Sequence, residues 1–382
     1  MSPRLLAFDF IAGCLSVRDD PDTDRILRSS MAAGSLDWDL IIAMADRQNI
    51  APALWAALSK RALAALLPAK ARGTLFKQHL LNTFKNKAFK DQAVEIVRQF
   101  NAVGIEPVLL KGAVSLFLAT FDDPGARVMA DLDILVPAQS AQACWEALCA
   151  AGYQPIDDKF NVTVDYARHH HLRPLYRPNY YGTVEIHREA LPESAARILP
   201  TALVWAEAEP VVNPFGVAMK APSPSHRVLH NLLHSGLING TYARGAPALR
   251  SLHELAAMQA VHGNAIDWKG LAQMLGRSGQ GKVLSGSLYL AQRLLGNPLP
   301  EGIPGAARAV LHHARIRSQL RWSGLDELVE RVCWFSKASI CEFYRCGDDF
   351  WSVGKSRLRL GMQLIWKRAV GPPLSQRLNK AS

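Results

Sequence analysis

The hydrophobic periodicity of this chain changes at Gly104, and this change constrains the fold more than any other feature. Before Gly104, apolar residues recur at helical spacing, and the run 71–103 is amphipathic and contains no proline. After it, PVLLKG and DLDILVP are short aliphatic runs bounded by Gly or Pro, which is typical of strands. The helical period returns from Ser225 onward. Helices at both ends with short strands between them predict an α+β fold.

The middle third of the chain carries further signals of local structure. A short helix is expected at 113–120, a turn at 122–126, and an amphipathic helix at 138–151 that ends at Gly152. HHHLRPLYRP and GTVEIHREAL then indicate two strands of a hairpin, with its turn at 179–182. The core of the chain is therefore expected to be a small sheet with helices packed on it.

Composition bounds the number of packed units. The chain has 382 residues, of which 49% are hydrophobic and 20% charged, so it can bury a full core in two or three units. We expect an N-terminal helical region, a core, and a C-terminal helical region with a basic tail, at 1–94, 95–215 and 216–382.

The compartment expected from the sequence is the cytoplasm. No apolar run reaches the length of about 18 residues that a membrane span requires, and the first residues lack the order of a signal peptide. The six cysteines are scattered without CxxC pairs, which is typical of reduced thiols. We expect neither a disulfide nor a cysteine zinc site.

Positive charge is concentrated toward the C-terminus. The net charge is +11, and the tail 351–382 has seven Lys and Arg and no acid, interleaved with apolar residues. Such a tail can contact anionic lipid or RNA, but the same pattern is typical of a basic helix that docks its apolar face on its own domain. The pattern favours the second interpretation.

Two aspartates lie two residues apart in one predicted strand. Because strand side chains alternate, Asp131 and Asp133 project from one face while Leu132 and Ile134 face the core. Paired carboxylates repel each other unless a cation neutralises them, and Mg²⁺ prefers such oxygens together with substrate phosphate. For this pattern alone, a solvated strand edge is the favoured interpretation, and the neighbouring residues decide between the two.

Upstream of this strand the sequence offers groups that bind phosphate. Lys111 and Gly112 lie where the PVLL strand runs into a helix, and Arg127 lies four residues before Asp131. Taken singly, Lys111 and Gly112 are more typical of a strand-to-helix turn with a solvent-facing lysine, and Arg127 is more typical of a surface arginine. Their order along the chain is more distinctive: strand, Lys-Gly, helix, turn, Arg, DxD strand, helix, and a hairpin containing VEIH.

With this order, the segments from LLKGAVSLFLATFDDPGARVMADLDILVP to TVEIHREAL resemble bacterial nucleotidyltransferase family proteins, distant relatives of DNA polymerase beta. The resemblance covers about 95–191 and implies a polymerase beta-like core, a small mixed sheet with helices. It further implies that Asp131, Asp133 and Glu185 hold a catalytic metal, with two Mg²⁺ ions expected and Mn²⁺ as a substitute. Glu185 would complete the ion that activates the acceptor hydroxyl. The GTVEIH strand is expected to pair at the sheet edge beside DLDILV, which buries Val184 and Ile186 and turns Glu185 to the metal-bearing face.

The resemblance also implies the nucleotide contacts. Lys111 and Gly112 would steady the triphosphate of an NTP such as ATP, and Arg127 would assist the leaving pyrophosphate. His187 shares a strand face with Glu185, so it would orient that acid or contact the base. The chain has Lys-Gly where many relatives have Gly-Ser, and it has a longer gap before the DxD, so these contacts follow less directly from the resemblance than the metal ligands do.

Three functions are compatible with this sequence. The first is transfer of an NMP group from an NTP to a hydroxyl-bearing acceptor, which can be a small metabolite, a sugar, RNA or protein. The second is a nucleotide-binding or interaction protein without turnover, and the third is a phosphotransferase on the same fold. Retention of all three acids favours the first.

Two histidine groups invite a metal interpretation. His226, His230 and His234 are spaced i, i+4, i+8 on a predicted helix, but no HExxH pattern accompanies them. A satisfied stripe of histidines is the favoured interpretation, with contact to the nucleotide or acceptor cleft as another. In HHH at 169–171, strand alternation would split the side chains between faces.

Overall fold

The computed structural model of the protein describes residues 2–18, 21–156, 166, 169–303, 307–334, 354, 355 and 358. The chain forms two compact units, Met1–Arg317 and Ser318–Ser382. The first unit carries the sheet. The basic tail expected to contact lipid, RNA or its own domain lies almost wholly outside the described residues.

The N-terminal part is helical, as predicted. Its helices are α1 (Pro3–Cys14), α2 (Pro21–Ala32), α3 (Trp38–Arg47), α4 (Ala51–Lys60) and α5 (Ala69–Ala102), with a short turn η1 (Ala64–Leu66). Side-chain caps begin two of them, because Ser2 accepts from the Leu5 amide and Asp37 accepts from the Leu40 amide. Gly104 follows α5 with φ +77°, a conformation that glycine adopts without steric cost.

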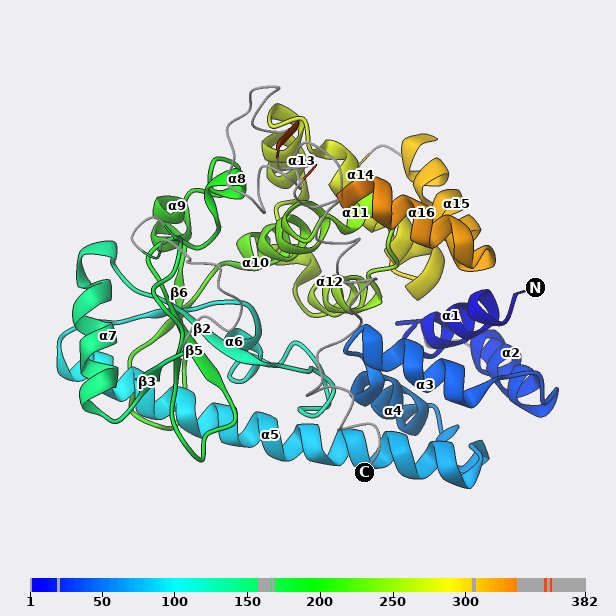
Figure 1. Ribbon diagram of the computed structural model, residues 1–382, viewed down its shortest axis with the longest axis horizontal. Helices are drawn as coiled ribbons and strands as arrows, with labels where there is room; N and C mark the ends of the chain where they lie inside the picture. Colours follow the sequence, from blue (N-terminus) through cyan, green and yellow to red (C-terminus); the bar gives the residue numbers. More distant parts are fainter. Residues whose placement is uncertain are drawn as a thin grey trace. The chain divides into compact units, whose positions relative to one another are not determined.

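The run 71–103 forms one unbroken helix, α5, of 34 residues. At 1.5 Å per residue it is about 50 Å long. Its first half packs on α4 and its second half lies along the sheet and α7 (Figure 1). The domain boundary that we placed at residue 94 falls inside this helix.

A seven-stranded mixed sheet forms the core, in the order β3-β4-β5-β2-β1-β7-β6 (Figure 1). The strands are β1 (Val108–Leu109), β2 (Asp131–Leu135), β3 (Gln154–Pro155), β4 (Leu175–Tyr176), β5 (Thr183–His187), β6 (Glu209–Pro210) and β7 (Lys220–Ala221). The β2 strand pairs with β5 in parallel and with β1 antiparallel. The α+β class is confirmed, and so is the expected pairing of GTVEIH beside DLDILV. The β5 strand is not at the edge of the sheet, however, because β4 covers its other side.

Several short elements differ from the expectation. The predicted helix at 113–120 begins earlier and is shorter, as α6 (Lys111–Ser115). Of HHHLRPLYRP only β4 is a strand, and His171 adds one isolated bridge to His187. The strands β3, β6 and β7 were not predicted because two residues are too few to show an alternating pattern. The last of these, β7, lies beyond residue 215, where we ended the core.

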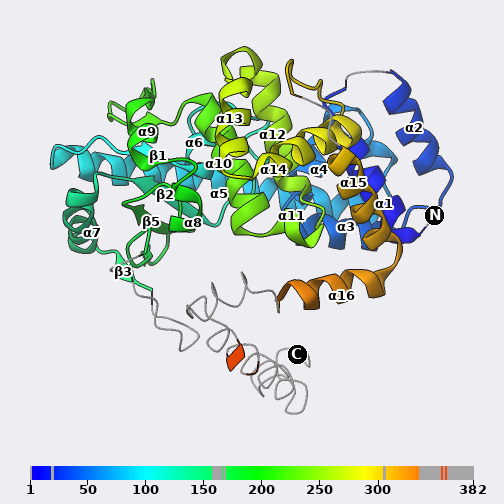
Figure 2. The ribbon, with the colours of Figure 1, turned by 90° about the horizontal axis from the view of Figure 1, so that it is seen from above.

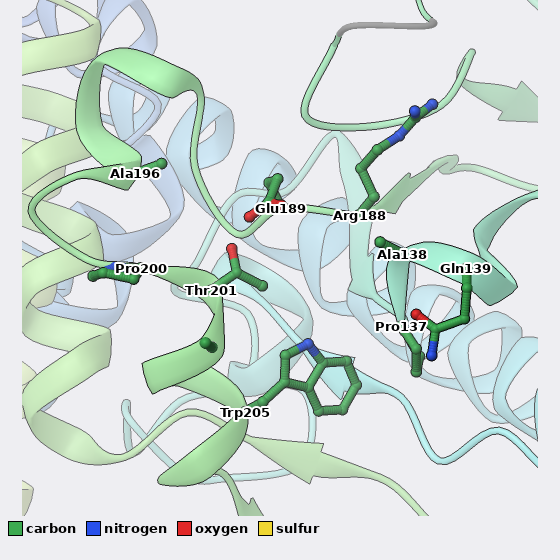
Figure 3. Close-up of a pocket in the computed structure, with 10 residues that line it drawn as sticks. Pro137, Ala138, Gln139, Arg188, Glu189, Ala196, Pro200, Thr201 and Trp205 are labelled. Carbon is green, nitrogen blue, oxygen red and sulfur yellow. The ribbon is translucent and has the colours of Figure 1, made fainter.

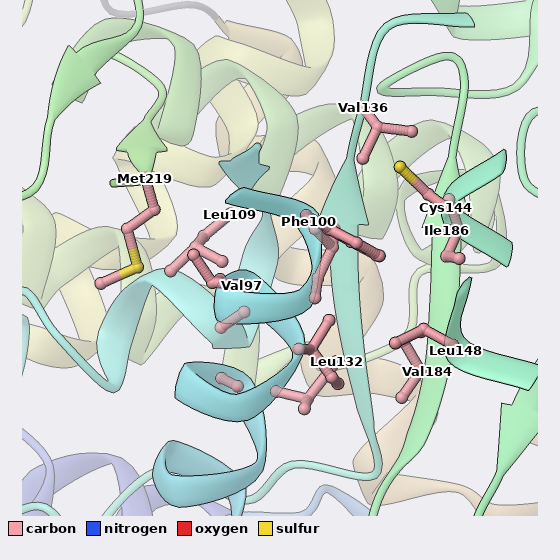
Figure 4. Packing of buried hydrophobic residues seen from close by; sticks show 14 of the residues in the cluster. Val97, Phe100, Leu109, Leu132, Val136, Cys144, Leu148, Val184, Ile186 and Met219 are labelled. Atoms are coloured by element: carbon pink, nitrogen blue, oxygen red, sulfur yellow. The ribbon is translucent and has the colours of Figure 1, made fainter. Parts of the chain in front are cut away.

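One face of the sheet is buried under α5 and α7 (Ala141–Ala150), which follows the turn η2 (Ala138–Ser140). Phe100 of α5 and Leu148 of α7 pack on Leu132, Val184 and neighbouring strand residues (Figure 4). Each such fully buried side chain contributes roughly 1.5–3 kcal/mol to the free energy of unfolding. Since the alternate residues of β2 and β5 face this core, the remaining ones face the opposite side, where the polar site lies.

The second core joins the sheet to the helices that follow it. Val108, Leu110 and Leu135 pack with apolar residues of α8 to α14. In both ribbon views α8, α9 and α10 lie next to the sheet (Figures 1 and 2). These elements are α8 (Glu193–Ala196), α9 (Thr201–Ala206), α10 (Pro224–Leu232), η3 (Leu233–Ile238), α11 (Thr241–Arg244), α12 (Leu249–His262), η4 (Gly263–Ala265), α13 (Trp268–Arg277), α14 (Gly281–Leu290) and η5 (Ala291–Leu295). The helices α15 (Ala307–Arg321) and α16 (Ser323–Trp334) follow. No helix among the described residues combines the length and the apolarity that a membrane crossing needs.

Candidate functional site

The acidic residues of β2 and β5 come together on one face of the sheet. Asp133 lies directly opposite Glu185 in the parallel pairing, and Asp131 lies opposite Thr183. The intervening Leu132 is fully buried in the core on the other face. The Asp133 side chain is only 1% exposed and that of Glu185 20% exposed, so both carboxylates stand in a region with little water.

Lys111 provides the cation closest to these acids. Its Nζ donates to Asp133 Oδ1 at 2.5 Å, across the antiparallel pairing of β1 with β2. The Lys111 backbone has φ +45°, in the left-handed region that a residue with a side chain adopts at some cost. Burial acts to lower the pKa of Lys111, but the charge of Asp133 outweighs it and raises that pKa. The lysine therefore stays charged.

His187 is enclosed between the acids and the backbone. Its side chain is fully buried, with Nε2 2.9 Å from Asp133 Oδ1 and 3.6 Å from Glu185 Oε2. Its Nδ1 lies 3.2 Å from the carbonyl oxygen of Glu189. A carbonyl and a carboxylate both accept, so both ring nitrogens carry protons in this geometry. Accordingly the pKa of His187 is raised, because hydrogen bonds to Asp133 and Glu185 outweigh burial.

The three acids differ in how readily they ionise. Burial opposes ionisation of Asp133, but the charge of Lys111 and the hydrogen bond from His187 outweigh it and lower the pKa of Asp133. The pKa of Glu185 is likewise lowered against burial, chiefly by the hydrogen bond from His187. By contrast, burial and then the charge of Asp133 raise the pKa of Asp131. The charges of Lys111 and Arg250 oppose this rise in the pKa of Asp131 but do not cancel it.

The residues 169–171 do not form a regular strand, so the expected split between faces is wrong. The three imidazole rings cluster with centroids 4.1–4.7 Å apart. His171 Nε2 lies 3.6 Å from Glu185 Oε2, and its Nδ1 is 2.7 Å from the Leu172 carbonyl. The His171 and His187 rings are 5.3 Å apart, so His171 extends the site on the side of Glu185.

Arg127 lies against Gly112 and pairs with an acid from a distant helix. Its Nη2 is 3.1 and 3.2 Å from the two carboxylate oxygens of Glu254 in α12. A Cβ at Gly112 would lie 2.1 Å from Arg127 Nη1, so only glycine leaves room for the guanidinium. The turn before β2 is held by α5, because Asn82 and Asn86 both donate to the Arg127 carbonyl oxygen, at 2.9 and 2.8 Å.

Two further arginines belong to the same neighbourhood. Arg250 of α12 donates to the Val128 carbonyl at 2.9 Å, and Arg227 of α10 donates to Thr120 Oγ1 at 2.6 Å. The charges of Arg127, Arg250 and Arg227 lower the pKa of Glu254 against its burial. Sequence reasoning missed both arginines, since neither belongs to a motif and both lie about a hundred residues after the DxD.

A pocket of about 570 Å³ opens beyond the C-terminal ends of β2 and β5 (Figure 3). Pro137 and Gln139 border it on the β2 side, Arg188 and Glu189 on the β5 side, and the Trp205 ring on the α9 side (Figure 3). None of the seven residues predicted for the site lines this pocket, but Glu189 does, and its carbonyl oxygen lies 3.2 Å from His187 Nδ1.

Comparison with known protein families decides the class of the site. Residues 34–296 match the sequence profile of a family described as "uncharacterised nucleotidyltransferase". The chain belongs to this nucleotidyltransferase family. A search of curated proteins returned no match. The family assignment confirms the resemblance inferred from the Lys-Gly turn, the DxD strand and the VEIH strand.

The donor atoms of this nucleotidyltransferase fit a divalent cation. Ligand atoms of Asp133, Glu185 and His187 all lie within 4.8 Å of one another. Carboxylate oxygens suit Mg²⁺ or Mn²⁺, whereas His187, protonated on both ring nitrogens in this geometry, would have to lose a proton before it bound a cation. Lys111 Nζ already binds Asp133 Oδ1 as a cation does, which fits a carboxylate that needs a positive partner. Asp131 lies on the same strand face but outside this group of three.

The predicted histidine stripe of the nucleotidyltransferase divides in two. His226 Nε2 lies 3.3 Å from the carboxylate of Glu207, which is not one of the three acids of the site. The rings of His230 and His234 stack with centroids 6.1 Å apart. Burial is the main cause that lowers the pKa of each histidine, and the charge of Lys111 is the second. Burial lowers the pKa of His230 to about 3 and that of His234 to about 4, so both are neutral near pH 7. The stripe forms no metal cluster among the described residues.

Proposed function

We propose that the protein is a cytoplasmic, metal-dependent nucleotidyltransferase that moves an NMP group from an NTP to a hydroxyl group of an acceptor. One observation carries the proposal: Asp133 and Glu185 stand opposite each other on parallel strands, with Asp131 on the same face of β2. The acceptor attacks the α-phosphorus, a new P–O bond forms, and the bond to the departing pyrophosphate breaks. Such transfer requires the three groups in line and compensation of phosphoryl charge.

Asp131, Asp133 and Glu185 would hold the divalent cation, Mg²⁺ or Mn²⁺. When bound, this cation neutralises phosphoryl charge and makes the acceptor hydroxyl more reactive. The raised pKa of Asp131 supports this role, because the charges of Lys111 and Arg250 do not outweigh its burial and the charge of Asp133. Glu185, whose side chain is 20% exposed, would serve the acceptor side.

Lys111 and His187 would prepare the acids before substrate binds. Both donate to Asp133 Oδ1, so they keep this carboxylate ionised and fix its orientation. When an NTP enters, Lys111 Nζ is the nearest mobile positive charge and can turn from Asp133 to a phosphate oxygen. The Gly112 amide would lie beside that phosphate, and Arg127 would receive the leaving pyrophosphate.

The test uses each α-³²P-labelled NTP with Mg²⁺ or Mn²⁺, with and without cell extract as a source of acceptor. The wild type should transfer label and release pyrophosphate, and Asp131→Asn with Asp133→Asn should abolish both. Asp39→Asn on α3, where the aspartate is exposed, is the matched control and should retain activity. Unchanged transfer in the double variant would refute the assignment of the acids.

The same reactions distinguish the competing functions. Release of a nucleoside diphosphate from γ-labelled NTP, with the label on the acceptor, would identify a phosphotransferase. Binding of the NTP with no product from any extract would identify a nucleotide-binding protein without turnover. Only pyrophosphate release coupled to labelling of the acceptor agrees with nucleotidyl transfer.

A further inference from the structure

Three arginines from separate parts of the chain surround one carboxylate beside the acid cluster. Arg127 precedes β2, Arg227 lies on α10 and Arg250 on α12, and each interacts electrostatically with Glu254. All three arginine residues are half-buried. They share the charge of Glu254, while Glu209 also acts on Arg227 and Asp131 also acts on Arg250.

The acids compensate the positive charge of the three arginines only in part. Burial and then the charge of Arg127 lower the pKa of Arg250 against Glu254 and Asp131. Burial also lowers the pKa of Arg227, although Glu254 and Glu209 act to raise it. Arg127 Nε is buried and has no hydrogen-bond partner among the described residues. A buried donor without a partner costs about 1–3 kcal/mol, so an anion that accepts from it would stabilise the fold.

The arginine cluster lies directly beside the acid cluster. Arg127 Nη1 lies over Gly112, the residue after Lys111, whose Nζ binds Asp133. On the other side Arg250 donates to the Val128 carbonyl, three residues before Asp131, and its charge favours ionisation of Asp131. The three acids of β2 and β5 therefore lie next to the cluster of three arginines, so a negatively charged region adjoins a positively charged one.

We infer that the arginine cluster of Arg127, Arg227 and Arg250 binds the β- and γ-phosphates of the NTP, so that α10 and α12 form the half of the site that receives the leaving pyrophosphate. This inference rests on the proposed function. The α-phosphate lies at the acids, where a cation compensates its charge, and the remaining phosphates extend over Gly112 toward α12. Glu254 holds Arg127 in place and sets the orientation of its guanidinium.

The planar guanidinium group suits this ligand. It presents several donors in a fixed fork that matches two phosphate oxygens, whereas an ammonium acts as a single point of charge. Arg227 is additionally fixed by Thr120 and by the His262 ring at 3.1 Å, so its donors are oriented before a ligand arrives. Oriented donors lose little conformational entropy when they bind.

The experiment measures binding of inorganic tripolyphosphate by calorimetry, in buffer with EDTA so that no metal takes part. The wild type should bind tripolyphosphate, and Arg250→Gln should lower the affinity about tenfold or more. Arg250→Lys should recover part of the lost affinity, because lysine restores the positive charge but not the planar set of donors of the guanidinium group. Arg277→Gln on α13 removes an exposed arginine and is the matched control, with unchanged affinity expected.

Arg227→Gln serves as the second variant and decides the question if Arg250→Gln does not fold. Asp131→Asn with Asp133→Asn should retain or increase tripolyphosphate affinity, since it removes negative charge beside the cluster. No binding by the wild type, or equal losses in Arg277→Gln and in the cluster variants, would overturn the inference. Binding that depends on the cluster, without any nucleotidyl transfer, would instead refute the proposed function and leave the anion site in place.

Discussion

Replacing Gly112 by alanine tests how Arg127 is held. The added Cβ would lie 2.1 Å from Arg127 Nη1 and 3.0 and 3.1 Å from Met129 Cγ and Cε. Methionine can adjust, but the guanidinium has to move, and it then loses its two contacts with Glu254. The exposed fractions of the paired side chains are 11% and 15%, so neither group regains full hydration when the pair breaks.

The expected cost of Gly112→Ala follows from these contacts. Breaking a buried ion pair by removal of one partner costs about 3–5 kcal/mol. Arg127 remains present after the substitution, and Glu254 keeps the nearby charges of Arg250 and Arg227, so the loss should be smaller. We expect the free energy of unfolding to fall by about 1–3 kcal/mol, together with a fall in tripolyphosphate affinity.

Urea denaturation at fixed pH measures this change. Gly276→Ala in α13 is the control, because its Cβ would meet nothing within 4 Å and alanine should stabilise the helix by about 0.5–1 kcal/mol. In an Arg127→Ala background, Gly112→Ala should cost little, giving a coupling energy of about 1–2 kcal/mol in a double-mutant cycle. If Gly112→Ala leaves stability and anion affinity unchanged, the proposed reason for glycine at this position is wrong.

Three further predictions concern single side chains. Glu185→Gln should reduce kcat about a hundredfold or more and leave NTP affinity nearly unchanged, because it alters the acceptor side; a change in KM alone would contradict this in steady-state kinetics. Lys111→Ala should raise KM for the NTP by about tenfold but not KM for the acceptor, since it removes a point charge from phosphate; equal changes in both would return Lys111 to a structural role. Burial lowers the pKa of His253 to about 4. Below the usual pKa of about 6.5 the unfolded chain binds a proton that folded His253 does not, so stability should fall between about pH 6.5 and 4 in denaturant titrations, and His253→Gln should lessen this slope.

The parts of the fold that local pattern determines were predictable. The helical run 71–103 became α5, and DLDILVP and TVEIH became β2 and β5, because periods of 3.6 and 2 residues are visible within each segment. The proximity of Glu185 to Asp133 followed from the need of GTVEIH to bury Val184 and Ile186 beside another strand. The preference of one strand to pair with another thus predicted a contact between residues more than fifty positions apart in the sequence.

What could not be predicted depends on tertiary packing of ordinary residues. Arg227, Arg250 and Glu254 lie on amphipathic helices where a charged residue usually faces solvent, and only the packing of α10 and α12 on β1 and β2 brings them to the site. His171 was missed for a different reason. Its segment was interpreted as a strand, whereas the backbone there makes only one isolated bridge, so alternation did not apply.

The unbroken α5 helix has a consequence for how this family can vary in length. His79 and Asn82 hold the turn at Asp123 and Gly125, while further along Gln92 donates to the Gly182 carbonyl, 3.2 Å away, at the start of β5. One inserted residue between these positions would rotate one set against the other by about 100° and move it by 1.5 Å. The length of α5 between these contacts therefore fixes the distance between the segment that carries Arg127 and the segment that carries Glu185. Relatives should accept insertions before Ala69 or after Gly104 but keep the stretch between His79 and Gln92 constant in length, and an alignment with gaps inside that stretch would contradict this.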